Sequence, residues 1–342
     1  MKIFLITLFI STSLFAEIKS GLIKMSENRE LLVSFNINER PSNQENLKNS
    51  EYVFILGPGV NRGMLPNDQM MKLLEEKNYN FVSFHNSTHP HSLVNSQTDV
   101  KPLHQDKFFE TEDYAEEFEF ISMWAQEQFK LRAIPVSLSF SGAASSKLSN
   151  FDYIIDISPM ISQKDALPEL ASYRETLERA NVFNPFREMV IRQAMDQSYA
   201  YVWRPKAREF VKAYKLDNKF VDTIYEGYMA SSRSLEKFKW DVNGDKQENR
   251  IFILGENEKE SLNEGQVRTV KEYLAQGKNL TCFFMRGMGH SIPMEAPQYT
   301  MAIIEFVVNH STQLKPGCYD VSKELKAEFY PVKELEKLFP IK

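Results

Sequence analysis

The sequence predicts an α/β fold: a mostly parallel, twisted β-sheet flanked by helices, with an all-helical cap inserted into it. Two observations carry this prediction. Short apolar runs typical of buried strands alternate with segments of helical periodicity, which favours a parallel sheet covered on both faces. The alternation stops at 161–240, where the recognisable segments are helical. We therefore expect a core formed by 17–160 and 241–342 and a cap formed by 161–240.

Residues 1–16 are expected to be a signal peptide. Lys2 gives a basic start, an apolar run covers 3–10, and small and polar residues lead to Ala16. The apolar run is well short of the ~20 residues that span a bilayer. We expect cleavage after Ala16, no stable membrane insertion afterwards, and a periplasmic or secreted location.

The expected strands are short apolar runs bounded by turn residues. In chain order they fall at 21–39 (two strands), 50–59, 80–86, 133–140, 151–159, 249–257 and 279–289. The expected helices of the core repeat apolar residues every three or four positions. They fall at 65–79, 111–132, 142–149, 264–278 and 296–310. Such sheets bind ligands at the carboxyl ends of their strands, so residues just after these strands are the candidates for a site.

The charge pattern excludes one class of partner. The formal net charge is −5 and is spread along the chain, without the basic stripe that a nucleic-acid-binding protein needs. We expect a small-molecule substrate and no nucleic acid.

A serine-rich stretch at 137–145 supplies a candidate nucleophile. It turns from an expected strand into an expected helix, and Ser141 lies between Phe140 and Gly142 with small residues two places to either side. A strained strand–turn–helix elbow requires small residues at those places. Glycine is usual there, and this chain has Ser139 and Ala143 instead. A serine-rich helix cap is the alternative interpretation.

A candidate general base follows the last predicted strand. His290 lies in a loop between Gly287–Gly289 and the next helix, where an imidazole is able to transfer protons. A serine nucleophile needs such a base within hydrogen-bond reach.

The order of strands, the serine elbow, the helical insertion, "ILGENE" and "GMGHSIPMEAP" resemble the α/β-hydrolase superfamily over nearly the whole mature chain. The resemblance implies the chain order nucleophile, acid, histidine. The family commonly places the acid three residues after the glycine that ends its strand, which is Glu258 here. Aspartate is more usual at that position, and Glu256 and Asp156 are the alternatives.

The resemblance also implies backbone donors for an oxyanion. One is the N–H of Gly142, directly after the expected nucleophile, and the other comes from the loop after the strand at 50–59. Pro58 has no N–H, so Val60 takes this position, with Gly59 as the alternative. Arg62, beside that loop, is a candidate ligand for a substrate carboxylate.

No metal and no cofactor are expected. His85, His89 and His91 lie close together, but carboxylate or cysteine partners at a fixed spacing are missing. The segment 241–252 begins like a calcium loop and lacks its glycine and its last glutamate.

Cys282 and Cys318 are the only cysteines, and the sequence leaves open whether they form a disulfide or remain buried thiols. The sequence as a whole predicts an exported serine hydrolase of a small or medium ester-like or amide substrate. The alternative is a non-catalytic binding protein that retains the fold, which the replaced glycines of the elbow and Pro58 favour.

Overall fold

The structure is a computed structural model that describes part of the chain. The described residues are 18–27, 29–37, 51–59, 69–85, 110–162, 185–186, 189–190, 234–235, 238–258, 260–290, 292–310 and 313–339. The expected signal peptide and nearly all of the expected cap lie outside these residues, so both remain predictions.

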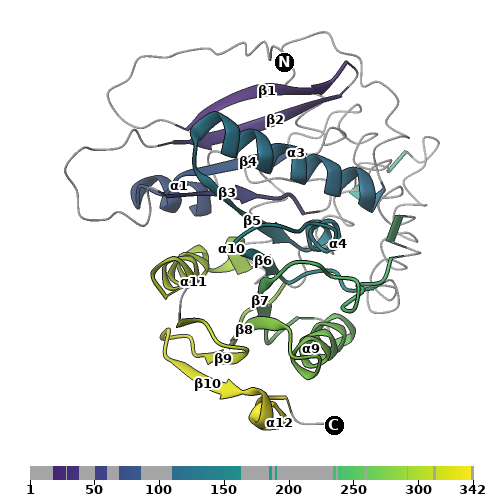
Figure 1. Cartoon of the computed structure of the whole chain (residues 1–342), viewed down its shortest axis with the longest axis vertical. Coiled ribbons are helices and arrows are strands. Elements are labelled where there is room, and N and C mark those ends of the chain that lie inside the picture. The colour runs from purple at the N-terminus through teal and green to yellow at the C-terminus, as the bar shows by residue number, and fades with distance from the viewer. Residues whose placement is uncertain are drawn as a thin grey trace.

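The centre of the molecule is a ten-stranded sheet in the order β1-β2-β4-β3-β5-β6-β7-β8-β9-β10. Six neighbouring pairs from β4 to β9 are parallel, as the sequence predicts. The parallel strands are β3 (Tyr52–Leu56), β4 (Phe81–His85), β5 (Arg132–Leu138), β6 (Ile154–Ile157), β7 (Asn249–Gly255), β8 (Asn279–Met285) and β9 (Gly317–Val321). In Figure 1 the strands follow one another from β1 near the top to β10 near the bottom.

Antiparallel strands extend the sheet at both sides. The β1 (Lys19–Ser26) and β2 (Arg29–Asn36) hairpin pairs with β4, which confirms the two strands predicted at 21–39. At the other side β10 (Ala327–Pro331) pairs with β9, a hairpin that the sequence analysis did not find.

Helices cover both faces of the sheet (Figure 1). One face packs against α1 (Gln69–Glu76), α10 (Ile292–Glu295) and α11 (Pro297–His310). The other packs against α3 (Thr111–Phe129), α4 (Phe140–Ser145), α9 (Glu260–Ala275) and α12 (Leu335–Leu338), with the single turn η4 (Val332–Glu334) before α12. Alternate residues of one strand therefore enter different cores: Ile253 packs on the first face and Phe252 on the second.

The chain leaves and re-enters the sheet domain at one point. Ser162 and Lys239 form an antiparallel bridge, and the Trp240 N–H donates to the Ile161 carbonyl oxygen at 2.8 Å. Adjacent ends are what an inserted unit requires. None of the helices in the described part of the chain is both long enough and apolar enough to cross a membrane.

The structure also places the two cysteines, the calcium-like segment and one of the clustered histidines. Cys282 and Cys318 lie opposite each other on β8 and β9, and both are buried free thiols. In the calcium-like segment the Asp245 carboxylate binds Arg250 and Tyr273, so the structure uses it within the protein. His85 is buried in β4, while His89 and His91 lie outside the described residues.

Candidate active site

Ser139 occupies a strained turn between β5 and α4. The strand ends at Leu138, the helix begins at Phe140, and Ser139 between them has φ 56° and ψ −110°. A positive φ is unfavourable for a residue with a Cβ, so the surrounding structure must hold it. Ser139 N–H donates to the Ile157 carbonyl oxygen at 3.0 Å, and its own carbonyl oxygen accepts from Met160 N–H at 3.0 Å. This is the strand–turn–helix geometry that projects a nucleophile from a sheet.

His290 lies against this serine. Its Nε2 is 2.7 Å from Ser139 Oγ, and its Nδ1 is 2.6 Å from Glu258 Oε2. The His290 side chain is 13% exposed and that of Glu258 is 0% exposed, so the contact between them is shielded from water. The three side chains come from the ends of β5, β7 and β8, which meet at the carboxyl edge of the sheet.

The expectation that Ser141 meets His290 is wrong, because Ser139 makes that contact. Ser141 Oγ instead accepts the Leu138 N–H at 2.7 Å and donates to the Leu138 carbonyl oxygen at 3.1 Å. Strand β5 ends two residues earlier than the sequence analysis placed it. Ser139 also satisfies the size rule, since the residues two places away are Ser137 and Ser141.

Glu258, the predicted acid, contacts His290 Nδ1 through its Oε2, as a residue that orients the imidazole should. The two alternatives are engaged elsewhere. Glu256 binds Arg286 Nη1 and the Gly287 N–H, each at 2.8 Å. Partial burial acts to raise the pKa of the Glu256 carboxyl. The hydrogen bonds from Arg286 and Gly287 outweigh this effect and hold the pKa below its ordinary range.

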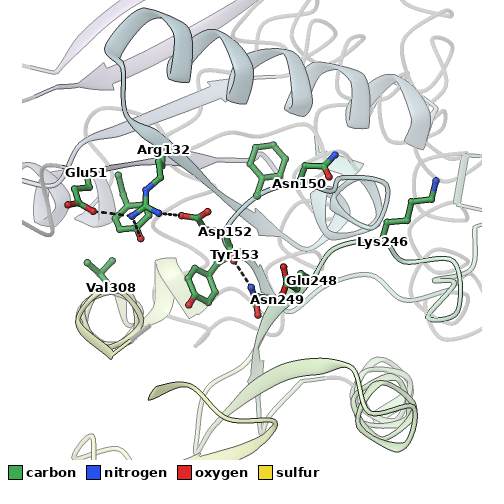
Figure 2. Close-up of a pocket in the computed structure, with 11 residues that line it drawn as sticks. Glu51, Arg132, Asn150, Asp152, Tyr153, Lys246, Glu248, Asn249 and Val308 are labelled. Carbon is green, nitrogen blue, oxygen red and sulfur yellow. Dashed lines mark hydrogen bonds and ion pairs between the residues drawn. The ribbon is translucent and has the colours of Figure 1, made fainter. Parts of the chain in front are cut away.

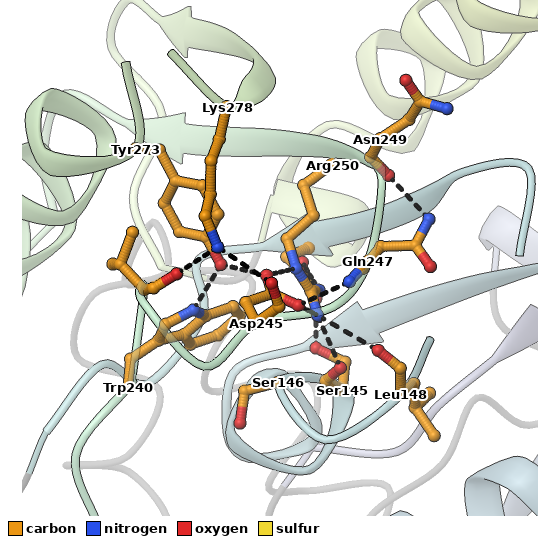
Figure 3. Close-up of polar contacts among 12 residues, drawn as sticks. Ser145, Ser146, Leu148, Trp240, Asp245, Gln247, Asn249, Arg250, Tyr273 and Lys278 are labelled. Carbon is orange, nitrogen blue, oxygen red and sulfur yellow. Dashed lines mark hydrogen bonds and ion pairs between the residues drawn. The ribbon is translucent and has the colours of Figure 1, made fainter. Parts of the chain in front are cut away.

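Asp156, the other alternative, belongs to a buried polar network around Arg250. Figure 3 shows Arg250 with two other members of this network, Asp245 and Ser145. Its carboxylate accepts from Ser137 Oγ at 2.6 Å and from Arg250 Nη1 at 2.9 Å, and it also binds Ser145. Burial raises the pKa of the Asp156 carboxyl, and its ion pair with Arg250 and hydrogen bonds with the two serines oppose that rise. Arg250 is 1% exposed and also pairs with Asp245. Sequence reasoning missed this network, although one arginine in the apolar run of β7 was its signal.

The oxyanion donors also need correction. The Gly142 N–H, expected as one donor, points back to the Ser139 carbonyl oxygen at 2.9 Å. If Ser139 is the candidate nucleophile, the N–H that directly follows it in the sequence is that of Phe140. It is the first N–H of α4 and has no acceptor within its own helix.

The loop after β3 passes close to the elbow. A Cβ at Gly57 would lie 2.7 Å from the Phe118 ring and 3.1 Å from Ser141 Oγ, so only glycine fits there. Gly59 belongs to the described part of this loop, whereas Val60 and Arg62 lie outside the described residues. Their predicted roles as oxyanion donor and carboxylate ligand therefore remain predictions.

A separate cavity of about 680 Å³ lies at the opposite, amino edge of the sheet (Figure 2). Its polar lining includes Arg132, which donates to Asp152 at 2.6 Å and to Glu51 at 3.0 Å. Ser139, His290 and Glu258 do not line this cavity. We regard the carboxyl edge as the candidate active site, because the strained serine and the histidine meet there.

No protein-family model matches the sequence, and no curated protein matches it. Solved structures are nevertheless similar in fold. A carboxylesterase of the ammonia-oxidizing thaumarchaeon Nitrososphaera gargenis has a TM-score of 0.60 at 14% identity, covering 86% of this chain and 99% of its own. A peroxisomal α/β-hydrolase of Saccharomyces cerevisiae has a TM-score of 0.55 at 13% identity, covering 97% of this chain and 93% of its own.

A laboratory-evolved variant of potato epoxide hydrolase is a third similar structure. It has a TM-score of 0.56 at 14% identity and covers 86% of this chain and 99% of its own. The three similarities extend over most of the chain, and at this level of identity they establish the fold.

Proposed function

We propose that this protein, which has the α/β-hydrolase fold, is a serine hydrolase in which Ser139 is the nucleophile. His290 is the general base, and Glu258 orients its imidazole. The observation that carries the proposal is the strained Ser139 with its Oγ 2.7 Å from His290 Nε2, while Glu258 Oε2 lies 2.6 Å from the other ring nitrogen. A serine hydroxyl becomes an effective nucleophile when a base accepts its proton in this way.

The geometry supports an acyl-transfer reaction. Ser139 Oγ attacks the carbonyl carbon of an ester-like or amide substrate while His290 Nε2 takes the hydroxyl proton. The buried Glu258 carboxylate stabilises the imidazolium that forms. Collapse of the tetrahedral intermediate passes that proton from His290 to the leaving group. A water molecule then hydrolyses the acyl–Ser139 ester by the same steps.

The oxyanion of that intermediate needs at least two donors. The Phe140 N–H is the first, because it follows the nucleophile at the start of α4. The second comes from the loop after β3, from Gly59 or Val60. We propose that the substrate is small or medium in size. We also propose that the enzyme is exported, because residues 1–16 have the pattern of a signal peptide.

The direct test is covalent labelling by an alkyl fluorophosphonate, followed by mass spectrometry of the labelled peptide. The wild-type protein should carry the label on Ser139, and Ser139→Ala should remain unlabelled. Ser141→Ala is the matched control, since it removes a serine two residues away and should still be labelled. A label on Ser141 would contradict the proposed nucleophile. A correctly folded wild type that stays unlabelled while a known serine hydrolase reacts would favour a binding protein.

The substrate class is tested separately. A series of p-nitrophenyl esters with increasing acyl length, run beside aminoacyl p-nitroanilides, should show turnover by the wild type and none above background by Ser139→Ala. Turnover that Ser139→Ala retains would show that another group carries the reaction.

A further inference from the structure

Arg286 joins two carboxylates at the carboxyl edge of the sheet. It is the first residue after β8. Its Nε and Nη2 donate to the two Asp320 carboxylate oxygens at 2.7 and 2.9 Å, and its Nη1 donates to Glu256 Oε1 at 2.8 Å. An arginine that binds one carboxylate through two parallel hydrogen bonds is fixed in direction as well as in place.

The two loops that Arg286 joins carry the partners of the proposed nucleophile. Glu256 begins the loop that leads to Glu258, and Arg286 begins the loop that leads to His290. Glu256 contributes a second connection, because its Oε2 accepts the Gly287 N–H at 2.8 Å. One carboxylate therefore binds the histidine loop through both of its oxygens.

Backbone contacts bring the same loops close together. The Glu256 N–H donates to the Met285 carbonyl oxygen at 3.0 Å, and the Asn257 N–H donates to that of Met288 at 2.7 Å. A Cβ at Gly255 would lie 2.2 Å from the Gly289 carbonyl oxygen, so no larger residue fits between the loops. The separation of Glu258 and His290 is thus set by a short, tightly packed segment of each loop.

Asp320 anchors this arrangement to the sheet. It lies in β9, which pairs with β8, and the Arg286 N–H donates to the carbonyl oxygen of its neighbour Val321 at 2.9 Å. The guanidinium also lies 5.1 Å from the centre of the Phe284 ring. The hydrogen bonds to Asp320 raise the pKa of Arg286 above its ordinary value, against the effect of its partial burial.

We propose that Arg286 is a positioning residue that links Glu256 to Asp320 and so holds Glu258 and His290 in contact. This inference rests on the proposed function. Catalysis is sensitive to small displacements of the reacting groups, so loosening the two loops should slow the chemical step more than substrate binding.

The test compares Arg286→Met with Arg132→Met in the full chain. Arg132 is a matched control because it also bridges two carboxylates, at the opposite edge of the sheet. The measurements are the second-order rate of labelling by an alkyl fluorophosphonate, and kcat and KM for a p-nitrophenyl ester that the wild type hydrolyses. Arg286→Met should lower the labelling rate and kcat about tenfold, with KM within about twofold of wild type. Arg132→Met should leave all three within about twofold of wild type.

A second set of variants separates positioning from loss of folding. Arg286→Lys keeps the charge but loses the paired hydrogen bonds, and should recover part of the rate. Glu256→Gln should lower kcat in the same direction, and the double variant Glu256→Gln with Arg286→Met should be no slower than Arg286→Met alone. Circular dichroism and thermal unfolding establish that each variant measured is folded.

The outcomes separate the two proposals. Labelled wild type with an unaffected, folded Arg286→Met would overturn the positioning role alone. The positioning role would also be overturned if Arg132→Met lowered the labelling rate and kcat as much as Arg286→Met does, or if Arg286→Met changed KM alone. An unlabelled wild type would overturn the proposed function, and the positioning role with it.

Discussion

At the amino edge of the sheet Arg132 binds Glu51 and Asp152, and at the carboxyl edge Arg286 also bridges two carboxylates. The two arginine side chains differ modestly in exposure, 54% for Arg132 and 38% for Arg286. They differ more in what they connect. Arg132 joins the starts of strands that are already aligned by sheet hydrogen bonds. Arg286 joins Asp320 in β9 to the loop after β7, and so connects the two loops that lead to Glu258 and His290. The same kind of ion pair therefore connects strand ends at one edge and, at the other edge, the two loops whose relative position the proposed mechanism depends on.

Backbone strain separates the two edges in the same way. Lys130 and Ser139 both have φ 56°, but Lys130 has ψ 36°, the ordinary left-handed ending of a helix, whereas Ser139 has ψ −110°. The first conformation ends α3 next to the amino edge. The second lies outside the left-handed helical region and is found at the serine that meets His290. The strained backbone therefore coincides with the serine whose hydroxyl the proposed chemistry uses.

The largest expected effect is on activity at the carboxyl edge. Ser139→Ala should lower kcat/KM for a p-nitrophenyl ester by at least about 10³-fold, because it removes the hydroxyl that contacts His290 Nε2. Ser141→Ala should lower it by no more than about tenfold, since the Ser141 Oγ binds the Leu138 backbone and not His290 among the described contacts. Steady-state kinetics measures both. Equal losses in the two variants would contradict the assignment of Ser139.

A large effect on stability is expected between the two edges. Arg250→Met should lower the free energy of unfolding by about 3–5 kcal/mol, because it leaves Asp156 and Asp245 buried without their counter-charge. Urea unfolding followed by circular dichroism measures the change. A loss below about 1 kcal/mol would show that the network does not depend on this charge.

A smaller effect on stability is expected at the amino edge. Arg132→Met should lower the free energy of unfolding by at most about 1 kcal/mol, because all three side chains of this ion pair are substantially exposed. The same urea experiment, run beside Arg250→Met, measures it. If Arg132→Met lowered the free energy of unfolding as much as Arg250→Met does, the exposed and the buried ion pairs would contribute equally to stability, contrary to this prediction.

The smallest expected effect is the dependence of stability on pH at Glu256. Its folded-state pKa lies below the ordinary value, so its contribution is complete above that value and is lost as the pH falls through the folded-state pKa. The loss therefore belongs to the acid range below pH about 4. Solvent screening limits it to a few tenths of a kcal/mol. Wild type and Glu256→Gln should unfold with a stability difference that shrinks on acidification, and a difference that grows would reverse the sign assigned here.

The order of the elements could be predicted because each parallel strand is a short apolar run and each helix has its own periodicity. The pairing of Glu258 with His290 could also be predicted, because the family resemblance implies the acid at Glu258 and His290 follows the end of a predicted strand. The sequence predicted Ser141 as the partner of His290 because Ser139 and Ser141 both have small residues two places away. The observed end of β5 and the contact of Ser139 Oγ with His290 Nε2 distinguish them.

Other features required coordinates for physical reasons. The partners of Arg250 include Asp156, 94 residues away in the sequence, so no local pattern identifies the pair. The β9–β10 hairpin has few fully buried residues and carries charged side chains, because β10 is an edge strand. Its sequence therefore lacks the apolar run that reveals the inner strands.

The bridge between Ser162 and Lys239 has a consequence for how this chain tolerates change. The bridge holds the two ends of the intervening segment next to each other. The entropic cost of closing a loop between such fixed ends grows only slowly with the length of the loop. We therefore expect that segments of very different size and sequence can connect Ser162 to Lys239 while the strands that lead to Ser139, Glu258 and His290 keep their register.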